Sequence, residues 1–199
     1  WESDTDEDEE ERRRREADDE ADPDRAQELR VAGNDHFKAG KLHDAREAYS
    51  EALYLTPSAL KKERAVLHCN RAACMQKLGR WDDVVEDCKA AVDLDPEYLK
   101  AWTRRSAAHE ALGKYHDALE DLKKAIELEP SLRSSEYKRQ AVLEKRAAEQ
   151  FDKDKDEMMS KLKDLGNTVL GKFGMSMDNF QMVQDPETGS YSIKYGNGS

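Results

Sequence analysis

Long apolar segments are missing from this sequence of 199 residues, in which 37% of residues are hydrophobic and 39% are charged. No apolar run approaches the roughly 18 residues that a membrane-spanning helix needs, and no secretory signal pattern is present. We therefore expect a soluble, cytoplasmic protein with a modest core and no membrane partner.

Cysteine is also scarce. Cys69, Cys74 and Cys88 lie in a stretch with a helical pattern, and none forms a CxxC pair or another spacing typical of metal ligands. We expect buried free thiols in a reducing compartment. The sequence predicts no metal site and no cofactor.

Catalytic constellations are absent as well. No glycine-rich phosphate loop occurs, and the histidines have no matched serine or cysteine nucleophile and no paired carboxylate. They fall on separate predicted helices, at His36, His43, His68, His109 and His116. The sequence therefore predicts a protein that is not an enzyme and has no catalytic residues.

Charge is distributed very unevenly. Residues 1–24 contain fourteen Asp and Glu and four Arg, which accounts for −10 of the total net charge of −11. A segment without apolar periodicity cannot offset its own ordering entropy. We expect residues 1–24 to form a disordered acidic tail ahead of a nearly neutral folded body.

Two short sequence patterns each occur three times. The first is KAGKLHDA at 38–45, KLGRWDDV at 77–84 and ALGKYHDA at 111–118. The second pattern ends in a proline, at Pro57, Pro96 and Pro130. In each copy this proline lies 17 residues after the glycine of the first pattern. Glycine suits the left-handed residue that ends a helix, and proline stops a second helix. Each copy therefore predicts two short helices around a tight turn.

The spacing of the copies is uneven. Gly79 and Gly113 are 34 residues apart, whereas Gly40 and Gly79 are 39 apart. We expect the extra residues, within SALKKERAVL, to lengthen the helix that opens the second copy.

These repeats resemble the tetratricopeptide-repeat family, whose 34-residue helix pairs stack into a right-handed superhelix. The resemblance covers residues 26–132. It implies an all-α superhelix of three helix-turn-helix repeats within a domain at 25–132, with the repeats at 26–59, 65–98 and 99–132. Departures from the family pattern are modest and consist of Cys88 and Leu122 in place of aromatic residues, and His36 and His109 in place of Tyr.

Residues 133–172 predict two further helices after the third copy. Residues 133–156 are typical of a long helix that caps the open apolar face of the last repeat. Residues 157–172 place Met158, Leu162, Leu165 and Val169 on one helical face. Residues 173–199 alternate apolar and polar positions around DPETG, which predicts a small β-hairpin or a flexible segment.

Five polar side chains are expected to converge on the first helices of the repeats. Arg30 and Asn34 are four residues apart, as are Lys100 and Arg104, and Asn70 lies 34 residues before Arg104. Residues four apart share a helix face, and equivalent positions in stacked repeats lie side by side. Three cations and two amides suit a carboxylate, because charged donors form strong hydrogen bonds with it.

This set is similar to the carboxylate clamp of chaperone-binding tetratricopeptide domains. The resemblance places Arg30 and Lys100 at the two lysines of that clamp, Asn34 and Asn70 at its asparagines, and Arg104 at its arginine. It implies a co-chaperone or adaptor, monomeric and without a nucleic-acid partner. The expected ligands are the acidic C-terminal tails of heat-shock protein 70 and heat-shock protein 90 chaperones.

A second hypothesis is a scaffold that holds another signalling protein through its convex face or its C-terminal segment. The sequence alone does not rank the two uses. Arg71 and Arg105 stand next to the clamp positions but one helical step away, and we expect them to be ordinary solvated side chains.

Overall fold

The computed structural model describes residues 18, 20–173, 176–177, 180–184 and 191–195. The chain divides into two compact units, Trp1–Ala147 and Ala148–Ser199.

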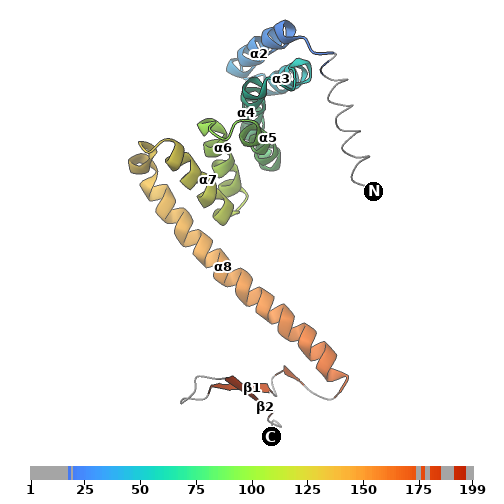
Figure 1. Cartoon of the computed structure of the whole chain (residues 1–199), viewed down its shortest axis with the longest axis vertical. Coiled ribbons are helices and arrows are strands. Elements are labelled where there is room, and N and C mark those ends of the chain that lie inside the picture. The colour runs from blue at the N-terminus through green and yellow to red at the C-terminus, as the bar shows by residue number, and fades with distance from the viewer. Residues whose placement is uncertain (1–17, 19, 174–175, 178–179, 185–190, 196–199) are drawn as a thin grey trace. The chain divides into compact units, whose positions relative to one another are not determined.

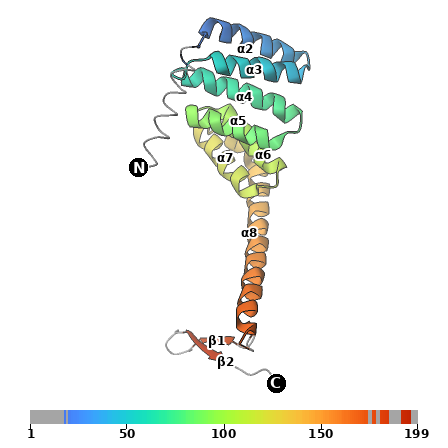
Figure 2. The ribbon, with the colours of Figure 1, turned by 90° about the vertical axis from the view of Figure 1, so that its right-hand side faces the viewer.

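The first unit holds three helix pairs and the start of a seventh helix (Figure 1). The first pair is α2 (Pro23–Lys38) and α3 (Leu42–Leu55), and the second is α4 (Lys61–Lys77) and α5 (Trp81–Leu94). The third is α6 (Leu99–Ala111) and α7 (Tyr115–Leu128), and α8 (Leu132–Gly171) follows it. Figure 2 shows the pairs stacked in chain order. The predicted all-α repeat superhelix is confirmed.

The helix that opens the second copy is lengthened, as the spacing predicts. Helix α4 has 17 residues, whereas its counterpart α6 has 13. Part of the insertion, Ser58 to Leu60, forms the connection before α4.

A glycine ends the first helix of each pair. Gly40, Gly79 and Gly113 have φ between +72° and +76°, a region that side chains with a Cβ disfavour. In each turn the backbone amide of the residue after the glycine donates a hydrogen bond to a carbonyl of the preceding helix. One example is Lys114 N to His109 O at 2.8 Å. This bond satisfies a carbonyl that the helix end leaves free, so the glycine sets where the chain reverses.

Small residues allow the helices to approach closely. Ala45, Ala52, Ala72, Ala91, Ala118 and Ala125 are fully buried. At Gly33 a Cβ would lie 2.7 Å from Cε1 of Tyr49, too close for any contact between such atoms. The absence of a side chain at residue 33 therefore lets the Tyr49 ring cross α2.

One buried ion pair joins the two helices of the second repeat, and an equivalent pair joins the two helices of the third repeat. Arg71 donates to Asp87 at 2.9 and 2.6 Å, and Arg105 donates to Asp121 at 2.9 and 2.6 Å. Both carboxylates are buried. The prediction that Arg71 and Arg105 are ordinary solvated side chains is therefore wrong, because each bonds a carboxylate 16 residues further along the chain.

These pairs make the fold sensitive to acid. Burial opposes ionisation of Asp87 and Asp121, but bonds from Arg71 and Arg105, with contacts from His68 and His109, outweigh it and lower both pKa values below 3.8. A depressed pKa contributes stability that is fully present above the unfolded value and is lost as pH falls through the folded value. We expect the urea midpoint to fall steeply below about pH 4, and to fall less in an Asp87→Asn, Asp121→Asn variant.

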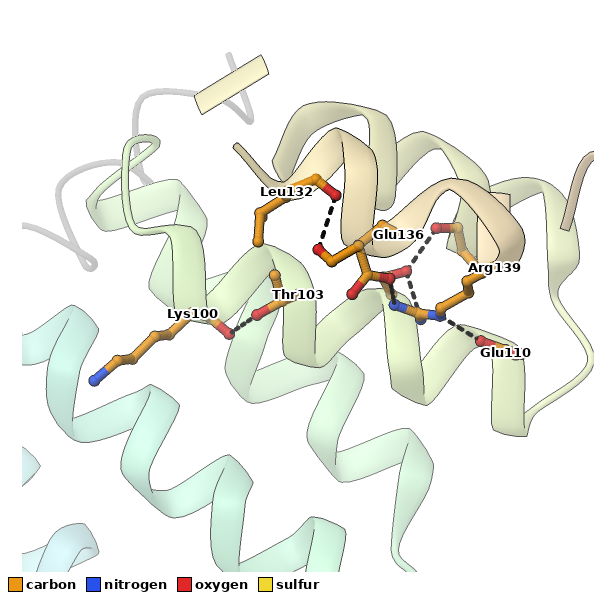
Figure 3. A network of polar contacts seen from close by, with 9 residues as sticks. Lys100, Thr103, Glu110, Leu132, Glu136 and Arg139 are labelled. Carbon is orange, nitrogen blue, oxygen red and sulfur yellow. Dashed lines mark hydrogen bonds and ion pairs between the residues drawn. The ribbon is translucent and has the colours of Figure 1, made fainter. Parts of the chain in front are cut away.

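The start of α8 covers the third repeat. Leu143 is fully buried and packs with Leu119, Leu122 and Ile126. Arg139 of α8 donates to Glu110 at 2.9 Å (Figure 3). It also donates to Ser106 Oγ at 3.0 Å. Sequence patterns predict two helices in 133–172, but the structure has one. No proline or glycine occurs between Leu132 and Leu165 to interrupt it.

The predicted acidic tail is described only at its end. Residues 1–17 and 19 lie outside the described residues. Asp22 accepts a hydrogen bond from Arg25 N at 3.0 Å and so caps α2, and its own amide donates to Leu55 O at 3.0 Å. Asp18 accepts bonds from the amide and hydroxyl of Ser58, both at 2.7 Å. The expected boundary at residue 24 thus falls inside the first helix.

These contacts change what truncation does. A disordered tail would be dispensable for stability, but deletion of residues 1–24 removes the Asp22 cap, worth about 1 kcal/mol. We expect the thermal midpoint to drop by several degrees on deletion of 1–24, and to stay nearly constant on deletion of 1–17. Equal midpoints for the two truncations would show that the Asp18 and Asp22 contacts contribute nothing.

The second unit contains the rest of α8 and a two-stranded antiparallel sheet. Strand β1 (Phe180–Gln184) pairs with β2 (Tyr191–Tyr195) in the register Phe180 with Tyr195 and Gln184 with Tyr191. The strands form the hairpin that the alternating pattern predicts, and the predicted DPETG turn lies outside the described residues.

Candidate functional site

The five predicted site residues all lie on the first helices of the repeats. Arg30 and Asn34 lie on α2, Asn70 on α4, and Lys100 and Arg104 on α6. Contacts between α4 and α6, and a hollow between α2 and α4, show that these helices neighbour one another. The five residues therefore lie on three helices, of which α4 neighbours both α2 and α6.

Arg104 is anchored to the neighbouring repeat. Its Nη1 donates to Cys69 O at 2.8 Å and lies 2.7 Å from Cys69 Sγ, and its Nε donates to Gln76 at 3.2 Å. Within the described residues, its Nη2 makes no hydrogen bond. The guanidinium is therefore held in place while one amino group can still donate to a ligand, which is how a preorganised site limits entropy loss.

Asn34 is oriented by the core. The Tyr49 hydroxyl donates to Asn34 Oδ1 at 2.8 Å. Burial is the main cause that raises the pKa of Tyr49 to about 12, so the phenol remains a proton donor at neutral pH. Because the amide oxygen of Asn34 accepts this bond, its NH₂ group is left to donate to a ligand.

The other three residues are less constrained. Arg30 donates from Nε to Gln27 Oε1 at 2.9 Å and is half-buried. The side chain of Asn70 has no hydrogen bond to any residue that the structure describes. Lys100 is exposed, and Figure 3 shows its side chain pointing away from the Glu110, Glu136 and Arg139 contacts.

The three cations of the candidate site differ from several arginines near them. Arg71, Arg105 and Arg139 lie on the first helices or the capping helix, and each has a carboxylate partner. Arg30, Lys100 and Arg104 form no ion pair within the described part of the chain. These three cations, one on α2 and two on α6, offer positive charge that an anionic ligand can neutralise.

A hollow of about 360 Å³ lies beside Arg30, and the sequence patterns did not predict it. Residues of α2 and α4 and of the connection before α4 line it, among them Ala26, Leu60, Val66 and Lys62. The helical spacing of Ala26 with Arg30, and of Lys62 with Val66, is the signal that could have revealed it. The hollow therefore combines apolar side chains with charged ones beside Arg30.

The thiol beside Arg104 is chemically distinct from the other two. A hydrogen bond from Cys88 and the charge of Arg104 lower the pKa of Cys69 to about 7, against the effect of burial. The same hydrogen bond and burial raise the pKa of Cys88, and burial raises that of Cys74 to about 11. All three are buried free thiols, as predicted. Cys69 alone is poised to carry charge near neutral pH.

The described side chains include no group of three or more His, Cys, Asp or Glu arranged to hold a metal ion. None of the described helices is both long enough and apolar enough to cross a membrane.

Comparisons with known proteins agree with the fold. The sequence pattern described as Tetratricopeptide repeat matches residues 99–132. Over 82 residues, or 41% of this chain, the sequence is 43% identical to mitochondrial import receptor subunit TOM70 of Rattus norvegicus. That alignment spans 13% of the receptor, so this chain matches only a small part of its curated relatives.

Solved structures extend the likeness. The first TPR of Spaghetti (RPAP3) bound to HSP90 peptide SRMEEVD has a TM-score of 0.58 and 31% identity, covering 65% of this chain and 98% of that one. The second TPR domain of human RPAP3, in complex with HSP70 peptide SGPTIEEVD, has a TM-score of 0.53 and 29% identity, with 60% and 95% covered. This chain belongs to the tetratricopeptide-repeat family.

Proposed function

We propose that this protein is an adaptor or co-chaperone that binds the acidic C-terminal tail of heat-shock protein 90 or heat-shock protein 70 chaperones. The observation that carries the proposal is a set of three cations, Arg30 on α2 and Lys100 and Arg104 on α6, that form no ion pair with any residue the structure describes. Asn34 and Asn70 add amide donors beside them.

The chemistry of such tails matches these donors. Peptides SRMEEVD and SGPTIEEVD, bound by the related domains, both end in Asp and so present two carboxylates at one residue. Arg30, Asn34 and Asn70 suit the terminal carboxylate, because a cation and two amides can donate to both of its oxygens. Lys100 and the open Nη2 of Arg104 suit the Asp side chain and nearby carbonyls.

The expected affinity is moderate. A hydrogen bond to a charged group contributes about 1.5 to 3 kcal/mol, whereas ordering a flexible tail costs roughly 2 to 5 kcal/mol or more. Several such bonds leave a binding free energy of about 8 kcal/mol, which corresponds to a micromolar Kd. A reversible complex of this strength is what an adaptor requires.

Amidation of the peptide tests the proposal directly. Calorimetry would compare a peptide ending in EEVD with a free carboxylate and the same peptide with a C-terminal amide. We expect amidation to weaken binding by about tenfold or more, because it removes one anion from the donors. Equal affinities would show that the protein binds through another surface and that the five residues are not a clamp.

Binding is also expected to depend on pH. The Cys69 thiol, whose pKa is about 7, becomes a thiolate as pH rises and neutralises the Arg104 cation that it contacts. The peptide carboxylates are ionised throughout this range. We therefore expect affinity to fall roughly threefold between pH 6 and pH 8, since a unit charge a few ångströms away changes the binding energy by about 1 kcal/mol.

Cys69→Ala is the control for this pH effect. The variant lacks the titrating thiol, so its affinity should be nearly flat between pH 6 and pH 8. A slope equal to that of the natural protein would assign the titration to another group.

A further inference from the structure

The second unit exposes an apolar stripe along α8. Five large residues spaced by seven, four, three and four lie on it, each between 53% and 69% exposed: Phe151, Met158, Leu162, Leu165 and Val169. This spacing is that of the core positions of a coiled coil, with Ala148 and Lys155 at the two remaining positions. Single exposed apolar residues are common, but a continuous stripe marks a contact surface.

The chain segment after α8 leaves this stripe open. Asn167 Oδ1 accepts hydrogen bonds from the amide of Met177 at 2.6 Å and the hydroxyl of Ser176 at 3.1 Å. Met177 also lies against Gly166, where a Cβ would be 2.1 Å from its sulfur. The returning segment therefore covers the flank formed by Gly166 and Asn167, while Leu162 and Leu165 stay more than half exposed.

The charges of the helix change sign along its length. Residues 149–157 contain five acidic and two basic side chains, whereas residues 158–172 contain three lysines and one aspartate. If two such helices packed side by side in the same direction, like charges would lie next to one another. In opposite directions, the acidic half of each faces the basic half of the other, which favours antiparallel pairing.

We propose that this surface binds a second copy of the same chain as an antiparallel helix pair. The register follows from the core positions: Phe151 packs against Leu162 of the partner subunit, and Ala148 packs against Leu165 of the partner subunit. The pair does not depend on the peptide-binding groove, because its residues belong to the second unit. It departs from the monomer that the sequence predicts.

The flanking residues agree with this register. Asp154 and Lys161 lie beside the stripe and, together with Glu157, line a shallow hollow along it. In the antiparallel register Asp154 faces Lys161 of the partner subunit, and symmetry creates this contact twice. In a parallel register the same Asp154 faces Met159 of the partner subunit, so charge reversal distinguishes the two arrangements.

The dimer is expected to be weak and concentration-dependent. Each helix contributes one core lysine, Lys155, which lies opposite Met158 of the partner subunit. A polar residue at a core position lowers stability while fixing register and orientation. The overlap of residues 148–165 is also short for a helix pair.

Analytical ultracentrifugation of the full chain over a range of concentrations tests the proposal. The natural protein should approach the mass of two chains as concentration rises, and Leu162→Glu should remain a monomer with unchanged helical circular dichroism. Asp154→Lys alone and Lys161→Asp alone should each raise the dimer Kd by roughly tenfold or more, because each turns two attractive contacts into repulsive ones. The Asp154→Lys, Lys161→Asp double variant should restore the natural Kd.

The controls separate the alternatives. Lys163→Asp removes a cation away from the predicted contact and should change the Kd much less than Lys161→Asp. A natural protein that stays monomeric at every concentration would overturn the proposal and leave the stripe to a different protein. A dimer that is insensitive to Leu162→Glu, or whose single charge reversals are not rescued by the double variant, would overturn the proposed antiparallel interface.

Discussion

Replacing Lys100 and Arg104 by alanine is expected to weaken the binding of an EEVD-ending peptide by roughly a hundredfold or more. Each lost hydrogen bond to a charged group is worth about 1.5 to 3 kcal/mol, and the two losses add to at least about 3 kcal/mol. Calorimetry at a temperature well below the thermal midpoint would measure the change.

Arg104 requires a separate stability measurement. From its place on α6, Arg104 bonds Cys69 and Gln76 of α4. We expect a loss of about 1 kcal/mol from these bonds, seen as a lower urea midpoint with unchanged helical circular dichroism. Lys100→Ala alone should weaken binding without this cost, because its exposed ammonium bonds no described residue.

Lys123→Ala with Lys124→Ala is the matched control. These lysines lie on α7, and each forms a solvent-exposed ion pair with a glutamate three residues away. The control removes the same charge from a second helix of a repeat. If it lost as much affinity as the Lys100 and Arg104 variant, general electrostatic attraction would explain the binding and the site assignment would fail.

Replacing Arg71 and Arg105 by alanine is expected to unfold much of the protein. Each change leaves a buried aspartate, Asp87 or Asp121, without its main counter-charge. Breaking a buried pair in this way costs about 3 to 5 kcal/mol, and two such losses are comparable to the whole stability of a typical domain, about 5 to 15 kcal/mol. Urea unfolding with circular dichroism would measure the effect.

A compensating change distinguishes lost charge balance from lost packing. Arg71→Met with Asp87→Asn removes both charges of one pair, so no uncompensated carboxylate remains. We expect this variant to recover most of the stability that Arg71→Ala loses. If it were as unstable as Arg71→Ala, the packing of the Arg71 side chain, and not its charge, would hold the helices together.

Features encoded by local sequence were predictable. The three turns could be predicted, because Gly40, Gly79 and Gly113 each adopt a backbone conformation that few other residues adopt. The placement of Arg30, Asn34, Asn70, Lys100 and Arg104 on the first helices was also predictable, because a fixed repeat length makes equivalent positions neighbours.

Other features had signals that were overlooked. Asp22 followed by Pro23 is a helix-start pattern, and it marks the first helix two residues earlier than the predicted domain boundary. Arg71 with Asp87 and Arg105 with Asp121 share a spacing of 16 and recur 34 residues apart, so the repeat itself indicated two equivalent pairs. The single helix α8 was indicated by the lack of glycine and proline before Gly166.

The sequence by itself determined the repeat fold, the turns and the identity of the cations on the first helices, because each depends on a residue's own conformation or on a constant spacing. The tertiary structure decided which cations have internal partners. Arg104 and Arg105 are adjacent in the sequence, yet Arg105 bonds a buried aspartate and Arg104 bonds a backbone carbonyl and a thiol. That difference depends on which side chains a neighbouring helix brings within about 3 Å, a distance that residue spacing along one helix does not specify.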